Sequence, residues 1–88
     1  DPRSSPYLRS LMPVVLSDLR PGQRALVLTI AGEPPLVQRL SEFGIFDGEQ
    51  LELVAFAPLG DPLEIRIGDT RLTLRLREAA CVTVEILP

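Results

Sequence analysis

Two stretches in the second half of the chain alternate strictly between apolar and polar side chains, and this pattern limits the possible fold more than any other feature. Residues 63–67 read Leu-Glu-Ile-Arg-Ile, and residues 71–76 read Arg-Leu-Thr-Leu-Arg-Leu. A period of two is typical of a β-strand that buries one face. Between them, residues 68–70 read Gly-Asp-Thr and favour a tight reversal. The sequence therefore predicts an antiparallel hairpin.

Three further strands are predicted from runs of apolar and β-branched residues that lie between turns rich in glycine and proline. They cover residues 24–30, 50–56 and 82–86. The first run alternates only weakly, which indicates a strand that is covered on both faces or nearly so.

One short helix, at about residues 35–43, is predicted between the first two strands of the chain. Two prolines at its start are tolerated, because N–H groups in the first turn have no partner inside the helix. Leu36, Leu40 and Phe43 recur at spacings of four and three, so they are expected to share one buried face. Gly44 is placed to end the helix in the left-handed conformation.

Five strands and one inserted helix in a chain of 88 residues leave room for one domain. Short strands with one apolar face bury that face, and hide their edges, by closing into a small barrel. We therefore expect a mainly β, five-stranded barrel in residues 13–88, with residues 77–80 as a short connector before the last strand. Residues 1–12, which are rich in proline and serine, are expected to be a flexible leader or a cloning remnant.

Charge and composition argue against several classes of partner. The net charge is −3, and the nine basic residues, all arginines, are scattered along the chain. Binding to nucleic acid needs a dense cationic face, so no nucleic-acid partner is expected. The sequence has no run of about 18 apolar residues, so direct membrane insertion is not expected. The single cysteine, Cys81, has no partner for an internal disulfide, which favours a reducing cytoplasm.

Residues that carry catalytic or metal-binding chemistry are scarce. The chain has no histidine, which removes the usual general base and the commonest transition-metal ligand. One cysteine cannot build a zinc cage. We therefore predict a protein that is not an enzyme and requires no cofactor. Asp61 and Glu64 are weak candidates for an adventitious divalent cation, since carboxylates alone select poorly among metals.

Three strings of the sequence resemble the FeoA family. Residues 16–23, LSDLRPGQ, are similar to the family's opening "L-S-x-L-x-P-G". Residues 39–48, RLSEFGIFDG, are similar to "R-L-x-x-L-G-L-x-P-G", although Asp47 stands in place of the proline. Residues 57–62, APLGDP, match the family string "A-P-L-G-D-P" in full. The likeness extends over about residues 16–85.

The resemblance implies both a fold and a partner. FeoA-family domains have an SH3-like barrel fold and are associated with FeoB, the membrane ferrous-iron transporter that carries a cytoplasmic G-protein domain. The chain is thus expected to be a cytoplasmic accessory or regulatory protein of bacterial ferrous iron uptake that contacts an FeoB-type transporter. Similar domains occur at the C-terminus of metal-dependent transcriptional repressors of the diphtheria-toxin-repressor type. A fragment of such a repressor, and a divalent-metal-binding protein, remain as alternatives.

Two segments are predicted to bind the partner. One is the loop of residues 57–62, with Pro58, Leu59, Gly60 and Asp61, and the other is the predicted helix and the turn after it, with Arg39 and Phe46. The prolines on either side of Leu59 restrict the loop, so it loses less entropy on binding. Leu59 is expected either to be exposed at the loop tip or to fold back and cap the open end of the barrel. The sequence leaves both alternatives open, together with a homodimer formed through edge strands.

Overall fold

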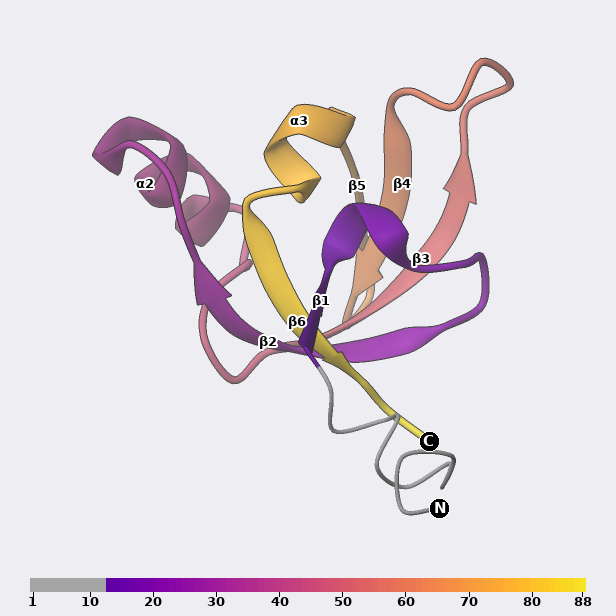
Figure 1. The fold of residues 1–88 in the computed structure, drawn as a ribbon, viewed down its shortest axis with the longest axis horizontal. Helices are drawn as coiled ribbons and strands as arrows, with labels where there is room; N and C mark the ends of the chain where they lie inside the picture. The colour runs from indigo at the N-terminus through magenta and orange to yellow at the C-terminus, as the bar shows by residue number, and fades with distance from the viewer. Residues whose placement is uncertain (1–12) are drawn as a thin grey trace.

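The computed structural model describes residues 13–88, and these residues form one curved antiparallel sheet with short helices at one end (Figure 1). The strands pair in the order β1-β6-β2-β3-β4-β5. Along the chain the elements are β1 (Pro13–Val15), the 3-10 helix η2 (Leu16–Asp18), β2 (Arg24–Ile30), α2 (Pro34–Glu42), β3 (Gln50–Phe56), β4 (Leu63–Ile67), β5 (Thr70–Leu74), α3 (Leu76–Ala79) and β6 (Val82–Ile86). The predicted leader, residues 1–12, lies outside the described residues.

The expected small, mainly β fold with one inserted helix is confirmed, but the strand count of five is wrong. The sixth strand is β1, which pairs with β6 through Val14 and Val84. A strand of three residues is too short to show a period of two, so the sequence pattern did not predict it.

The predicted closure into a barrel is also not found, because β1 and β5 stand unpaired with each other at the two ends of the sheet. The sheet instead curves strongly, and its register shifts at two places where one strand carries an irregularity. One lies between Val27 and Thr29 in β2, and the other between Leu53 and Ala55 in β3. Such bulges bend a strand and increase its twist. The curvature brings the helices over one end of the sheet.

The predicted hairpin is confirmed as β4 and β5, in which Ile65 lies opposite Leu72. The second strand, however, ends at Leu74 rather than at residue 76. Arg75 is the N-cap of α3, and Leu76 is the first residue of that helix. Alternation in the sequence continues one step beyond the strand because the first apolar residue of α3 also faces the core.

The hydrophobic core lies on the concave face of the sheet and is made almost entirely of leucine, valine and isoleucine. Its buried members are Leu16, Leu19, Ala25, Val27, Leu40, Ile45, Leu51, Leu53, Leu63, Ile65, Leu74, Ala79, Val82 and Val84. Strand β2 was expected to be covered on both faces or nearly so, and its two faces differ in burial. Ala25 and Val27 are buried, whereas Leu26 and Leu28 on its other face are only half-buried.

Helix α2 contributes one fully buried side chain, Leu40, to this core. Phe43 was expected beside it but is 48% exposed. The helix ends at Glu42, and Gly44 turns the chain with a φ of +96°. After this turn Ile45 is fully buried, and its N–H donates to the carbonyl oxygen of Leu40 at 2.9 Å. Ile45 therefore fills the place that helical periodicity assigned to Phe43.

These burial differences predict that Leu40→Ala lowers the free energy of unfolding by about 2–5 kcal/mol, because it leaves a cavity in the core. Phe43→Ala serves as the control and should cost less than about 1 kcal/mol, since the ring is half in water. Chemical denaturation of the two variants measures both values. Equal losses for the two variants would contradict the placement of these side chains.

Candidate functional site

Three segments that are far apart in the sequence come together at one end of the sheet. Helix α2, helix α3 and the loop between β3 and β4, residues 57–62, all lie at the end opposite the C-terminus (Figure 1). Residues 57–62 carry the string that most clearly resembles the FeoA family. This end of the molecule is therefore the first candidate for a functional site.

Two hollows at this end share Arg75 and Arg77 in their linings. The larger, of about 370 Å³, is lined by Arg39 of α2, Pro62 of the loop, Thr73 and Leu74 of β5, and Arg75, Arg77 and Glu78. The smaller, of about 300 Å³, is lined by Asp61, Arg75 and Arg77. We call the two hollows together the arginine groove.

Glu78 is the polar centre of the arginine groove. Among residues 13–88 it is the only charged residue that is buried, with 8% of its surface exposed. One carboxylate oxygen, Oε1, accepts a hydrogen bond of 3.0 Å from the backbone N–H of Arg75, and the other, Oε2, forms an ion pair with Arg39. The carboxylate of Glu78 thus closes the first turn of α3 and ties that helix to α2.

Asp61 plays the corresponding part on the loop side. Its Oδ1 accepts a hydrogen bond of 3.0 Å from the backbone N–H of Leu76, and its Oδ2 lies 4.0 Å from Nη1 of Arg75. The first contact satisfies an N–H group at the start of α3 that has no partner inside the helix. The second is long and exposed to water, so it adds little.

The predicted metal candidates, Asp61 and Glu64, contact different partners within residues 13–88. Glu64 lies 3.6 Å from Arg71, while Asp61 faces Arg75 and the start of α3. Each carboxylate is therefore occupied by a different arginine. Within residues 13–88, no three side chains of aspartate, glutamate, cysteine or histidine lie close enough together to hold a metal ion.

Of the two alternatives for Leu59, exposure at the loop tip is confirmed and capping of the core is wrong. The side chain is 97% exposed. The loop beneath it is held by two backbone hydrogen bonds, from Ala57 to the carbonyl of Pro62 at 2.9 Å and from Gly60 to the carbonyl of Ala57 at 2.7 Å. Gly60 has a φ of +91°, which other residues adopt only with strain. The loop is thus shaped before any partner arrives.

The structure separates the predicted partner-binding residues into two sets. Arg39 lines the larger hollow of the groove and Asp61 lines the smaller one. The others line neither hollow, and they are Pro58, Leu59, Gly60 and Phe46. Phe46 is 45% exposed in the turn after α2, close in sequence to the exposed Phe43.

Sequence reasoning missed three residues of the groove: Arg75, Arg77 and Glu78. Arg75 and Arg77 were assigned to a strand face and a connector, where isolated charges are ordinary. The one available signal was the string Arg75-Leu76-Arg77-Glu78, in which two arginines and a glutamate cluster beside the end of a strand. Only the structure shows that this cluster meets Arg39.

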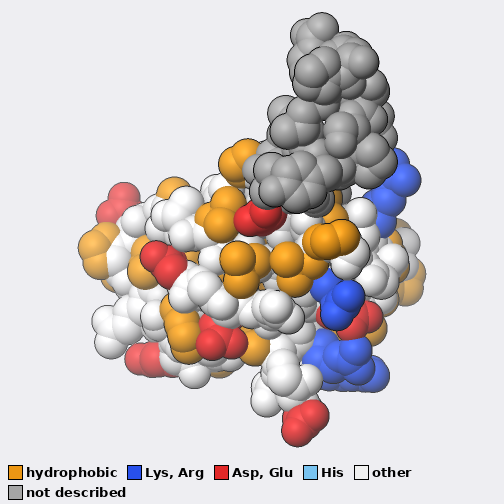
Figure 2. Space-filling view, turned by 90° about the horizontal axis from the view of Figure 1, so that it is seen from below, with side chains coloured by type: hydrophobic (Ala, Val, Ile, Leu, Met, Phe, Trp, Pro, Cys, Tyr) orange, Lys and Arg blue, Asp and Glu red, His pale blue; other side chains and the backbone are white. Residues whose placement is uncertain are grey.

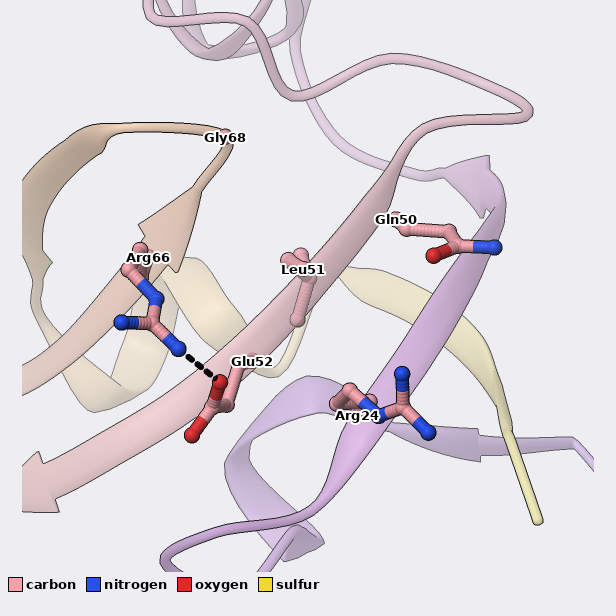
Figure 3. A pocket seen from close by; sticks show the side chains of 6 residues that line it. All are labelled: Arg24, Gln50, Leu51, Glu52, Arg66 and Gly68. Carbon is pink, nitrogen blue, oxygen red and sulfur yellow. Dashed lines mark hydrogen bonds and ion pairs between the residues drawn. The ribbon is translucent and has the colours of Figure 1, made fainter.

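A third hollow, of about 140 Å³, is lined by residues of β2, β3 and β4 (Figure 3). Its lining includes Glu52 and Arg66, whose side chains point toward each other at 2.5 Å, and Arg24. Because the hollow is small and Glu52 is already paired with Arg66, the hollow is a weaker candidate for binding.

Figure 2 shows the face at the lower edge of the view in Figure 1, where arginines gather on one side and acidic side chains are dispersed among apolar ones.

Among solved structures, this architecture is shared with small prokaryotic SH3-like domains. The FeoA of Stenotrophomonas maltophilia, which is described as a procaryotic SH3 domain protein and was crystallised with zinc, superposes with a TM-score of 0.71 at 34% identity, covering 82% of this chain and 89% of that one. The fold therefore defines an SH3-like domain, which confirms the expected fold class. The model of the FeoA domain matches residues 14–86, so the chain belongs to the FeoA domain family.

Two further relatives support this assignment. The solution structure of FeoA from Chlorobium tepidum has a TM-score of 0.81 and 43% identity, covering 85% of this chain and 71% of that one. A fusion of Fe²⁺ transport protein A with the Fe²⁺ transporter FeoB in Porphyromonas gingivalis is 35% identical over 72 residues, or 82% of this chain. This chain spans only 8% of the length of that fusion protein. The family is thus linked to ferrous iron transport.

A manganese-dependent transcriptional repressor also has this fold, with a TM-score of 0.78, although it is only 20% identical over 85% of this chain and 42% of that one. At that identity the likeness shows the fold alone. Within residues 13–88, no helix has the length and apolar composition needed to span a membrane.

The contacts of Glu78 predict that Glu78→Ala lowers the free energy of unfolding by about 1–3 kcal/mol, because it removes a hydrogen bond and an ion pair from a buried position. Glu42→Ala, on the exposed face of α2, is the matched control and should change stability by less than about 0.5 kcal/mol. Urea denaturation compares them. A Glu78 variant as stable as the control would show that the ion pair between the helices adds nothing.

Proposed function

We propose that this chain is a non-catalytic, cytoplasmic accessory domain of bacterial ferrous iron uptake that acts by direct contact with an FeoB-type transporter. The observation that carries the proposal is the relative from Porphyromonas gingivalis, in which an FeoA-type domain and FeoB are parts of one polypeptide. Fusion holds two modules at a high effective concentration, and it favours modules that work on each other.

Leu59 is the residue we assign to the centre of the contact. A leucine that is 97% exposed at the tip of a pre-shaped loop gains about 1.5–3 kcal/mol when a partner buries it. Because the backbone of residues 57–62 is already held by its own hydrogen bonds, little ordering entropy opposes binding. Arg39, which lines the same hollow as Pro62 of the loop, and Phe46, which is exposed in the turn after α2, are assigned to the contact as well.

No catalytic step is assigned to the domain, and no resident cofactor. The chain has no histidine, and the carboxylates at the candidate site, Asp61 and Glu78, already accept hydrogen bonds from the protein backbone. Regulation of the transporter, through its assembly, gating or GTP hydrolysis, is the role that remains for a domain of this kind. Within residues 13–88 strand β1 pairs only with β6, and a homodimer through its outer edge stays a further prediction.

The proposal is tested by titrating the chain against the FeoB-type transporter of the same organism in lipid discs, with GTP hydrolysis followed in the same sample. Saturable binding with a changed rate of hydrolysis is the expected result. Binding without a change would restrict the role to assembly or gating. Absence of binding at tens of micromolar would contradict the proposal.

Leu59→Glu is expected to abolish this binding and to leave the melting temperature nearly unchanged, since the side chain touches water and not the core. Gln50→Glu is the control, because it adds the same charge to an exposed residue at the other end of β3. Normal transporter binding by the Leu59 variant, or equal loss by both variants, would show that the loop tip is not the contact.

A metal chelator is expected to leave the denaturation midpoint of the chain unchanged, and added Zn²⁺ or Mn²⁺ should not raise it. A ligand that binds the folded state raises the free energy of unfolding, and the rise grows with the logarithm of the ligand concentration divided by its Kd. Asp61 and Glu64, each beside an arginine, are expected to bind such ions too weakly to have this effect. A clear rise of the midpoint with either metal would favour the alternative of a metal-binding protein.

A further inference from the structure

The arginine groove carries positive charge in a chain whose net charge is negative. Three arginines line it, and only two carboxylates, those of Asp61 and Glu78, lie among them. The ion pairs between residues of the range 13–88 do not include Arg77, and Arg75 has only the 4.0 Å contact to Asp61. Among residues 13–88, therefore, no carboxylate pairs closely with the guanidinium groups of Arg75 and Arg77.

The groove adjoins an open sheet edge. β5 pairs with β4 alone, and no other strand of the described residues covers its outer side. Alternate residues of an antiparallel edge strand direct their N–H and C=O groups away from the sheet. None of the turn and loop hydrogen bonds within residues 13–88 uses the backbone of residues 70–74. Thr73 and Leu74, at the end of this edge, are also part of the wall of the larger hollow.

We propose that β5 and the arginine groove together dock an extended, acidic peptide segment of a protein partner. The backbone of the segment pairs with the outer edge of β5, and its carboxylates meet Arg75 and Arg77. A guanidinium group binds a carboxylate through two parallel hydrogen bonds, which gives direction as well as charge. Addition of a strand to an exposed sheet edge is a general mode of peptide recognition.

The charges on β5 select this occupant over a second copy of the chain. Arg71, which lies 3.6 Å from Glu64, and Arg75, which follows β5 as the N-cap of α3, are both exposed on the polar face beside this edge. Pairing of two copies through β5 in a register that opposes these residues brings arginines together. A peptide with aspartate or glutamate at alternate positions meets the same arginines with favourable charge. A free phosphate or a lipid headgroup would use the guanidinium groups but leave the backbone edge unpaired.

This inference rests on the proposed function only in taking the partner to be a protein, and it concerns a surface that is separate from Leu59. It is tested directly on the full chain with a fluorescein-labelled peptide of three Glu-Thr repeats, and with the matching Gln-Thr peptide as control. We expect saturable binding of the acidic peptide that weakens with salt, and no binding of the neutral one. Binding of both with equal strength, or of neither, would overturn the proposal.

The double variant Arg75→Gln with Arg77→Gln should bind the acidic peptide about fivefold or more weakly, because two exposed charge pairs are lost. Arg20→Gln is the matched control, since Arg20 is exposed and lines neither hollow. Thermal melts of both variants confirm that they fold. Equal affinity in the double variant and the control would place the peptide elsewhere.

Amide hydrogen exchange in residues 70–74 distinguishes a paired strand from a simple anion site. Added acidic peptide should slow exchange at the outward-facing N–H groups of β5 at least severalfold. Two results together would show a small-anion site and overturn the strand-pairing model. They are complete displacement of the peptide by inorganic pyrophosphate, and an exchange rate in β5 that the bound peptide does not change. Binding to vesicles of phosphatidylglycerol in the absence of any peptide binding would also overturn that model.

The transporter titration keeps this result separate from the proposed function. Loss of peptide binding with intact transporter binding would remove the groove and leave the Leu59 contact in place. Peptide binding without transporter binding would leave the groove in place and assign it to a different protein partner.

Discussion

Burial of one apolar face by a single curved sheet is the constraint on which the rest of this domain depends. The inward side chains of the sheet form a core of leucine, valine and isoleucine, but the sheet does not close on itself. Its end is instead sealed by side chains from the helices and turns, such as Leu16, Leu40 and Ala79. Helices α2 and α3, which help to seal the core, also line the arginine groove, so core packing and the candidate site share these two helices.

Two carboxylates hold these sealing segments in place. Glu78 joins α3 to α2 through Arg39, and Asp61 joins the β3–β4 loop to the first turn of α3. Both use backbone N–H groups of a helix that is only one turn long, which has few hydrogen bonds of its own. A short helix that depends on side chains for its caps gives a firm wall to the groove. The two acidic residues are compatible with the proposed docking of an acidic segment, because their carboxylate oxygens already accept hydrogen bonds from the protein backbone.

The candidate surfaces differ in the kind of partner contact that they offer. Leu59 offers apolar area on a preformed loop, whereas Arg75 and Arg77 offer charge beside an unpaired strand. Apolar area supplies most of the affinity of a protein contact, and charge supplies selectivity and speed of association. A domain that engages and leaves a large partner, as we propose for this chain, benefits from both. The family relationship, and the fusion with FeoB in a relative, link the family to ferrous iron transport.

The sequence by itself determined the β-rich fold, the hairpin of β4 and β5, the position of α2 and the family. These follow from local periodicity and from contiguous strings, both of which a linear sequence displays. Only the tertiary structure decided that β1 joins the sheet, that Ile45 replaces Phe43 in the core, and that Leu59 is exposed. It alone decided that Arg39 meets Glu78 and that Arg75 and Arg77 face the same groove. Contacts between residues far apart in the chain depend on how strands curve and helices end, and no local pattern encodes that geometry.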